Sequence, residues 1–388
     1  MIDFDFSSKC TGCGVCVDAC PKGCISLRKN SKGFLVPDVK INDCVSCGLC
    51  DKVCPVLNAH YLSFEKRKLY RAFNLNEKIR EKGSSGSIFY IVAKYVIENG
   101  GCVFGAAFSD DFKLRHVKAE KLPDVLPLMK SKYLQSETTG VYSEVKNELK
   151  KNRLVLFVGT PCQTQALYNF LGAKKSENLI LMDFICHGVP CQELFDRCLK
   201  NYEEKNNCKV VDFSFRQKTE ERLRNCKIES ISKEGERKTF IINSADYPFY
   251  NGYLKYIIFR NCCYKCQFVG EDRVSDFTLG DFWGLEKTED IKDFNRGYSM
   301  LYVNSAKGAN LLKILAEEMD LKEYDKNSPI AFNYAYLKPT RRSILNRFFM
   351  WDYNRVSQET LEKRYFGKSK EYPFFKKLLW YIIYKLKI

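Results

Sequence analysis

The chain has 388 residues, 45% of them hydrophobic, which suffices for two or three domains with a sizeable core. Its 63 lysines and arginines outnumber 47 acidic residues, and the net charge of +16 predicts an acidic partner: a protein, a nucleic acid or an anionic membrane. No apolar run reaches about 18 residues, so the sequence predicts no membrane-spanning helix.

The first 54 residues contain nine of the 19 cysteines, in two copies of one pattern. Each copy reads Cys-x2-Cys-x2-Cys-x3-Cys-Pro, from Cys10 to Pro21 and from Cys44 to Pro55. Three thiolates at this spacing bind one 4Fe-4S cubane, and the fourth cysteine of each run binds the other cluster. The predicted ligands are Cys10, Cys13, Cys16 and Cys54 for one cluster, and Cys20, Cys44, Cys47 and Cys50 for the other. Structural zinc is the alternative, but it usually uses two separated Cys-x2-Cys pairs.

Residues 1–60 are expected to form this dicluster ferredoxin domain. Ile25–Leu27 and Phe34–Val36 flank the turn-like residues 30–33, which predicts a β-hairpin. A domain of this size buries little apolar surface, so its clusters are expected to act as its core.

The middle of the chain alternates predicted helices and strands. Helices are expected at 87–98, 141–151 and 162–171, and strands at 102–108, 154–158 and 179–185. Continuous apolar strands between helices are typical of a parallel sheet covered on both faces. Cys162 and Cys186 follow two of these strands, at the sheet edge where α/β proteins bind ligands.

A further pair, Cys263-x2-Cys266, follows a helix predicted at 249–259, with Cys262 directly before it. Together with Cys162 and Cys186, this pair forms a candidate third metal site. In the alternative interpretation, Cys162 and Cys186 are small buried apolar residues and the pair binds zinc. The spacing alone leaves both interpretations open.

Several motifs in chain order resemble the beta subunit of the coenzyme F420 hydrogenase/dehydrogenase family. They are residues 82–87, 100–107, 131–136, 159–163, 186–190 and 215–218, followed by Arg260, Cys263, Cys266, Arg273, Asp276 and residues 280–284. The resemblance covers roughly residues 40–300. It implies that Cys162, Cys186, Cys263 and Cys266 bind a third cluster.

The same resemblance implies an FAD site. The residues alone do not predict it, because no Gly-x-Gly-x-x-Gly motif follows a strand. The loop at 83–86 precedes a helix whose N-terminus suits a pyrophosphate, although the residues alone favour an ordinary helix cap. The implied FAD contacts are Ser84, Ser85, Gly86, Ser87, Lys132, Tyr133, Gln135, Ser136 and Thr160. The expected fold is an α+β ferredoxin-like domain followed by an α/β flavin and iron–sulfur domain at 61–340.

The implied function is an oxidoreductase that passes electrons from a low-potential donor, such as a ferredoxin, through the clusters to FAD and an organic substrate. A glycan precursor in surface-polysaccharide assembly is one expected substrate. The alternative is an electron-transfer subunit of a larger redox complex. No residue is identified as a catalytic acid, and His187 is expected to have a structural role.

Nucleic acid is not expected as a partner, because no basic module with exposed aromatic residues is recognisable. The acidic start of the chain and its many cysteines predict a cytoplasmic protein without disulfides. Residues 341–388 form a basic, aromatic tail, and the apolar stripe at 373–388 predicts a helix. Such a helix either packs on the domain or lies on an anionic inner-membrane surface.

Overall fold

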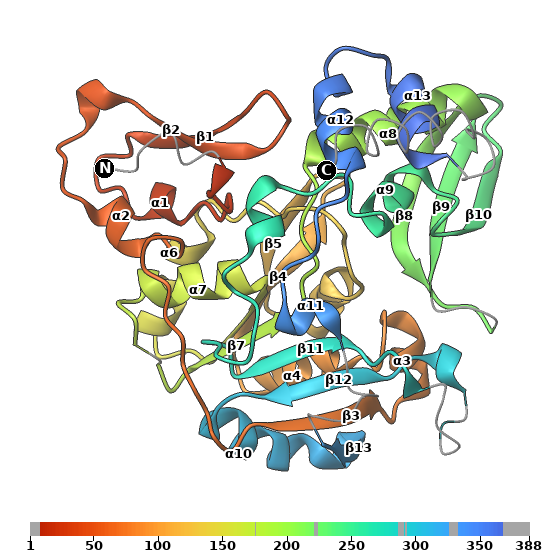
Figure 1. Ribbon diagram of the computed structural model, residues 1–388. Coiled ribbons are helices and arrows are strands. Elements are labelled where there is room, and N and C mark those ends of the chain that lie inside the picture. Colours follow the sequence, from red (N-terminus) through yellow and green to blue (C-terminus); the bar gives the residue numbers. More distant parts are fainter. Residues whose placement is uncertain are drawn as a thin grey trace, which may run out of the picture.

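A computed structural model describes residues 8–174, 176–220, 224–285, 291, 293–325 and 333–367. The small N-terminal module lies beside a large mixed sheet, and a second, three-stranded sheet lies on the other side of the molecule (Figure 1). No helix of the described chain is long and apolar enough to cross a membrane.

The N-terminal module contains one hairpin and two short helices. Strands β1 (Ile25–Lys29) and β2 (Leu35–Val39) pair antiparallel, which confirms the predicted hairpin. In its turn, Asn30 Oδ1 accepts hydrogen bonds from the backbone N–H groups of Lys32 and Phe34. Helices α1 (Val15–Asp18) and α2 (Leu49–Val53) each lie within one cysteine motif.

The eight-stranded sheet has the order β13-β3-β12-β11-β7-β6-β4-β5. Its strands are β3 (Lys68–Asn74), β4 (Cys102–Phe108), β5 (Leu114–Ala119), β6 (Val155–Gly159), β7 (Leu179–Phe184), β11 (Phe277–Asp281), β12 (Ser299–Val303) and β13 (Met319–Tyr324). The neighbours β4, β6, β7 and β11 are parallel, whereas the outer strands pair antiparallel. The three strands predicted here are confirmed, in a mixed rather than purely parallel sheet.

Helices cover both faces of this sheet because successive strand residues point to opposite sides. Val103, Leu156 and Ile180 pack with α4 (Ile88–Glu98) and α10 (Ala306–Leu315). The adjacent residues Phe104, Phe157 and Leu181 pack with α6 (Val141–Lys150) and α7 (Pro161–Phe170). Short helices α3 (Glu77–Lys82) and α5 (Leu122–Val125) complete this part of the fold.

The second sheet consists of β8 (Cys208–Gln217), β9 (Asn225–Ser232) and β10 (Arg237–Asn243) in antiparallel pairing. Helices α8 (Gln192–Asn206), α9 (Pro248–Leu254), α12 (Leu345–Asp352) and α13 (Gln358–Leu361) gather beside it (Figure 1). Helix α9 ends earlier than the predicted 249–259, and Tyr256 has a positive φ of 57°.

Part of the region expected to be a basic tail belongs to this second core. Phe349, Leu361, Tyr365 and Phe366 are buried among side chains from α8, α9 and the three-stranded sheet. The expected boundary at 341 therefore does not separate residues 341–367 from the domain. The helix predicted at 373–388 lies outside the described residues.

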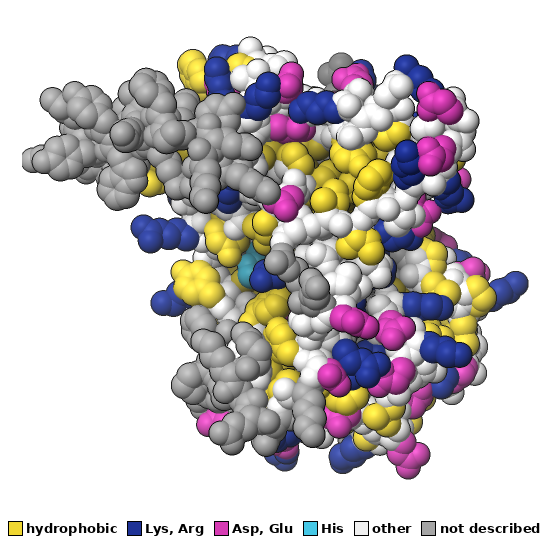
Figure 2. Space-filling view, turned by 90° about the vertical axis from the view of Figure 1, so that its right-hand side faces the viewer, with side chains coloured by type: hydrophobic (Ala, Val, Ile, Leu, Met, Phe, Trp, Pro, Cys, Tyr) yellow, Lys and Arg dark blue, Asp and Glu magenta, His cyan; other side chains and the backbone are white. Residues whose placement is uncertain are grey.

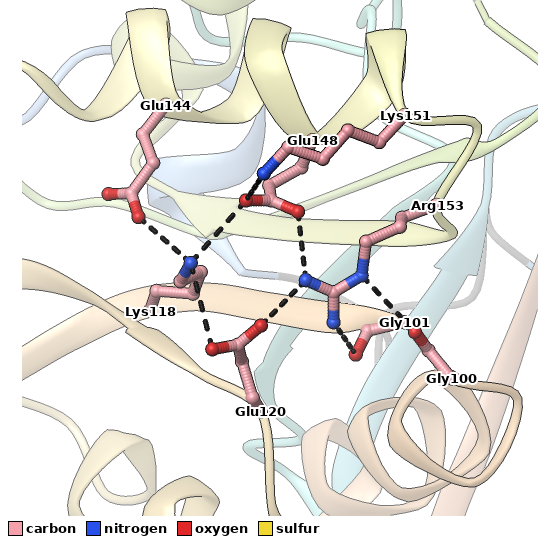
Figure 3. A network of polar contacts seen from close by, with 8 residues as sticks. All are labelled: Gly100, Gly101, Lys118, Glu120, Glu144, Glu148, Lys151 and Arg153. Carbon is pink, nitrogen blue, oxygen red and sulfur yellow. Dashed lines mark hydrogen bonds and ion pairs between the residues drawn. The ribbon is translucent and has the colours of Figure 1, made fainter.

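An ion-pair network joins β5, α6 and Arg153, which lies two residues before β6 (Figure 3). Glu148 of α6 pairs with Lys118, Lys151 and Arg153, and Arg153 also donates to the carbonyls of Gly100 and Gly101. On the face in Figure 2, basic and acidic side chains are interspersed around patches of apolar atoms. Despite the net charge of +16, that face is not uniformly basic.

Candidate functional site: three sets of cysteines

The ferredoxin module brings together the predicted ligands of one cluster at its surface. Cys20, Cys44, Cys47 and Cys50 line one small pocket, and Cys24 lines it too, with its Sγ 3.4 Å from that of Cys20. Within this exposed set, Cys47 is the most open to solvent. The tertiary structure thus unites the fourth cysteine of the first motif with three cysteines of the second.

In the other predicted set of this module, Cys13 and Cys16 are buried and Cys10 and Cys54 are partly exposed. Burial raises the pKa values of Cys13 and Cys16 far above that of a free thiol, and the neighbouring thiols of Cys10 and Cys54 add to the rise. These four cysteines, the middle set, are therefore close enough to interact electrostatically. Thiolate ligands must be deprotonated, so positive iron would have to offset this cost.

The third set lies where the α/β sheet meets the second core. A cavity of about 590 Å³ is lined by Cys162, Cys186, Cys263 and Cys266, and also by Cys262. Cys162 lies in the first turn of α7, and Cys186 follows β7. Cys263 lies within the 3₁₀ turn Asn261–Lys265, and Cys266 directly follows it. These inner-set cysteines come from segments far apart in sequence.

Local backbone features hold the inner set together. Thr160 and Gln163 form a capping box at the start of α7, with Pro161 in the first turn. Gly188 has a φ of 130°, and an added Cβ would lie 2.6 Å from the Phe259 ring and 3.1 Å from Cys263 Cβ. Only glycine therefore permits the chain after Cys186 to pass so close to Cys263.

The pKa values of the thiols in the inner set are shifted in different directions. Burial raises the pKa of Cys162 to about 12, although the hydroxyl of Thr160, 3.1 Å from the sulfur, opposes this rise. A hydrogen bond with the thiol of Cys262 lowers the pKa of Cys263. Four cysteine side chains that line one cavity suit the ligands of an iron–sulfur cluster.

The three sets form a series in space. Cys16 belongs to one packed cluster with Cys20, Cys44 and Cys50 of the exposed set, and Cys13 packs with residues of α7, the helix that carries Cys162. The middle set therefore lies between the other two. Within the described residues, no group of three His, Cys, Asp or Glu side chains could hold a single metal ion. A cubane instead distributes its four thiolates over several irons.

The cavity at the inner set also touches the ferredoxin module. Thr11, Val56 and Leu57 line one part of it, so two modules share its wall. Basic side chains in the lining are Lys9, Lys265, Arg273 and Arg342, and no acidic residue is found among the described residues that line it. This positive surrounding suits a cluster with four anionic thiolates.

The structure places the predicted FAD contacts in two groups. In the first, Ser84 Oγ accepts a hydrogen bond from the N–H of Ser131, and Ser87 donates to the carbonyls of Ile79 and Arg80. Gly86 packs so tightly that an added Cβ would lie 2.2 Å from the Ala72 carbonyl oxygen. Ser85, Lys132 and Tyr133 belong to the same region.

The second group lies at the inner cysteine set. Gln135, Ser136 and Thr160 all line the shared cavity, and Gln163 donates a hydrogen bond to Ser136 Oγ. Gln135 donates to the carbonyls of Thr11 and Gly12 in the ferredoxin module. Gln135, Ser136 and Thr160 therefore lie beside the inner cysteine set and the ferredoxin module.

Sequence reasoning gave no individual role to two basic residues beside the Ser84–Ser87 loop. Arg216 is 1% exposed, pairs with Asp281 at 2.8 Å and donates to the Ser84 carbonyl. Lys218 donates to the carbonyls of Arg80 and Ser85. The run Phe215–Lys218 was recognisable as a motif, but its spacing does not show which loop it contacts.

Two family models match the segments of the chain that contain the cysteine sets. Residues 9–58 match the family described as "4Fe-4S dicluster domain". Residues 152–327, which include all four cysteines of the inner set, match the family described as the C terminus of the beta subunit of coenzyme F420 hydrogenase/dehydrogenase. The Ser84–Ser87 loop precedes the second match.

The F subunit of the F(420)H(2) dehydrogenase from Methanosarcina mazei is 22% identical over 195 residues, 48% of this chain and 54% of that protein. The chain thus spans about half the length of this curated relative. A chain of the F420-reducing NiFe hydrogenase complex from Methanosarcina barkeri superimposes with a TM-score of 0.44 and 14% identity, over 80% of this chain and 96% of that chain. By the two family matches, residues 152–327 carry the C-terminal domain of coenzyme F420 hydrogenase/dehydrogenase beta subunits, behind a 4Fe-4S dicluster domain at residues 9–58.

Proposed function

We propose that this chain is an iron–sulfur electron-transfer subunit of a larger oxidoreductase complex. The observation that carries this proposal is the spatial series of exposed, middle and inner cysteine sets. Bound cubane clusters would supply one-electron exchange. The protein would hold them in sequence, with the exposed set available to a partner and the inner set enclosed by the α/β domain.

The surroundings of each set support different roles along this path. The loop that carries Cys44 and Cys47 of the exposed set is rich in exposed apolar side chains. Ile41, Val45 and Leu49 have 62%, 57% and 40% of their surfaces accessible. Such a loop would let an electron carrier, for example a ferredoxin, approach closely. The inner set instead lines a cavity whose wall also includes Gly188 and residues of the ferredoxin module.

Iron analysis of the anaerobically purified protein tests the ligand sets. Three cubanes predict about twelve irons per chain. Cys162→Ser is expected to remove about four of them and leave the ferredoxin clusters intact. Cys191→Ser is the matched control, because Cys191 is buried beside Tyr353 and does not line either cysteine pocket. Full iron content in Cys162→Ser, or an equal loss in Cys191→Ser, would contradict the proposal.

A second candidate function is an FAD-dependent reductase, favoured by the basic residues near the Ser84–Ser87 loop. Arg216 Nε is buried without a hydrogen-bond partner among the described residues. Burial, together with the charges of Arg80 and Arg216, lowers the pKa of Lys218 to about 7. A bound pyrophosphate would satisfy Arg216 and offset the repulsion at Lys218. Bound FAD would supply two-electron chemistry for an organic substrate.

Flavin content tests this second candidate. Lys218→Met is expected to lose FAD with unchanged iron, whereas Lys200→Met, on the exposed face of α8, is expected to retain both. Gly86 is a poor target, because any side chain there would collide with β3. Wild-type protein without flavin would exclude this function and leave the proposed electron-transfer role unaffected.

A further inference from the structure

The first cysteine loop of the ferredoxin module is held by side chains of the α/β domain. Arg260 Nη1 donates to the Cys10 carbonyl at 3.1 Å. Gln135 Nε2 donates to the carbonyls of Thr11 and Gly12 at 2.7 and 2.9 Å. Thr138 and Tyr142 donate to the Cys13 carbonyl at 2.6 and 2.7 Å. Four consecutive carbonyl groups therefore point toward the α/β domain.

Arg260 is the centre of this contact. It is 2% exposed, its Nε and Nη2 both donate to Gln135 Oε1, and Nη2 also donates to the Leu35 carbonyl. Its guanidinium lies 5.0 Å from the centre of the Phe34 ring. Within the described chain its hydrogen-bond acceptors are neutral oxygens, so a buried positive charge remains beside Cys10. The planar fork of arginine suits this task and the single ammonium of lysine does not.

This contact orients the backbone around the middle cluster site. In a trans peptide the C=O and the following N–H point in opposite directions, so carbonyls held on one side leave N–H groups directed to the other. Accordingly, Gly12 N–H donates to Cys10 Sγ at 3.3 Å. Gly12 also lets the contact form, because an added Cβ would lie 2.5 Å from both Arg260 Nη2 and Gln135 Nε2.

The second cysteine loop offers an internal comparison. Ser46 N–H donates to Cys44 Sγ at 3.4 Å, as Gly12 does in the first loop. Val45, Ser46 and Cys47 are nevertheless exposed, and no comparable set of side-chain donors holds the described carbonyls of this loop. Hydrogen bonds to sulfur, net charge and solvent exposure set the potential of a cluster. Two nearly identical motifs therefore occupy unlike environments.

We propose that Arg260 and Gln135 are positioning residues that make the two ferredoxin clusters inequivalent, by raising the reduction potential of the middle one. Reduction adds one electron from an external reductant and forms or breaks no bond. The buried charge of Arg260 and the fixed Gly12 N–H both favour the extra negative charge. The inference rests on the proposed function through the ligand sets of the middle and exposed clusters.

Anaerobic redox titration of the iron-loaded protein, followed by electron paramagnetic resonance, tests the proposal. A relaxation agent in solvent identifies the exposed cluster, because its signal broadens first. Arg260→Gln is expected to make reduction of the middle cluster about tenfold less favourable, about 59 mV for a one-electron couple. The exposed cluster should keep its potential.

Three further variants separate positioning from general damage. Arg260→Lys retains the charge and should shift the middle cluster less than Arg260→Gln. Gln135→Ala should shift it in the same direction without any change of charge, and it replaces Arg260→Gln if that variant does not fold. Arg28→Gln is the control, because Arg28 forms an exposed ion pair with Asp38 in the same module.

Unchanged potentials in iron-replete Arg260 and Gln135 variants would overturn this inference alone. So would equal shifts of both clusters, or a shift of the middle cluster in Arg28→Gln. Wild-type protein that binds no iron at the ferredoxin module would refute the proposed function and this inference with it.

Discussion

Replacement of Glu148 by glutamine tests the ion-pair network that ties α6 to β5, an edge strand of the large sheet (Figure 3). The Glu148 side chain is 4% exposed and faces Lys118, Lys151 and Arg153. Burial by itself would raise its pKa, but hydrogen bonds from Lys151 and Arg153 and the nearby charges outweigh burial. They lower the pKa from 4.5 to about 2.

The lowered pKa of Glu148 sets the expected loss of stability in the variant and the pH dependence of that loss. One pKa unit corresponds to about 1.4 kcal/mol, so the lowering is equivalent to roughly 3 kcal/mol of stabilisation. Solvent around Lys151, which is 63% exposed, reduces this to an expected loss of roughly 2 kcal/mol in Glu148→Gln. Because the folded-state pKa is lowered, the stabilisation is full above pH 4.5 and is lost as the pH falls toward 2.

Hydrogen exchange measures this local stability directly. Amides of α6 and of the Gly100–Gly101 turn should exchange about thirtyfold faster in Glu148→Gln at pH 7. Glu144→Gln is the matched control: Glu144 lies on the same helix, is 45% exposed and pairs only with Lys118 among the described contacts. Equal exchange rates in the two variants, or a difference that persists unchanged below pH 4, would refute this reasoning.

Two more predictions concern the candidate sites. Gly188→Ala should lose about four irons, because the added Cβ would collide with Phe259 and Cys263. The control Gly172→Ala should keep its iron, since Gly172 also has a positive φ but has open space around it. Equal iron contents in the two variants would contradict the close approach of Gly188 to Cys263. Burial and the charge of Lys130 lower the pKa of Lys132 to about 7, so the folded protein binds fewer protons than the unfolded chain between pH 7 and 10.5. The denaturation midpoint of the wild type should therefore rise relative to that of Lys132→Met as the pH increases through this window, and parallel pH profiles would argue against it.

The sequence by itself determined the features whose cause is local. The spacing of Cys10, Cys13 and Cys16 predicts a cluster-binding loop because ligands two residues apart can grip one cluster. The strands at 102–108, 154–158 and 179–185 follow from continuous apolar runs, which must be buried on both faces. The hairpin after Cys24 follows from two apolar segments and a turn-forming stretch.

Only the tertiary structure decided which distant segments meet. Three such contacts leave no periodic signal in the sequence. Cys13 lies near Cys162, Arg260 and Gln135 hold the first cysteine loop by hydrogen bonds, and Phe349 and its neighbours pack in the second core. These contacts form because the ferredoxin module packs into two cores: Phe34 packs with the C-terminal helices, and Val15 packs with the large sheet. Side chains such as Gln135 therefore acquire their partners from packing, whereas spacing within a motif fixes only the neighbours along the chain.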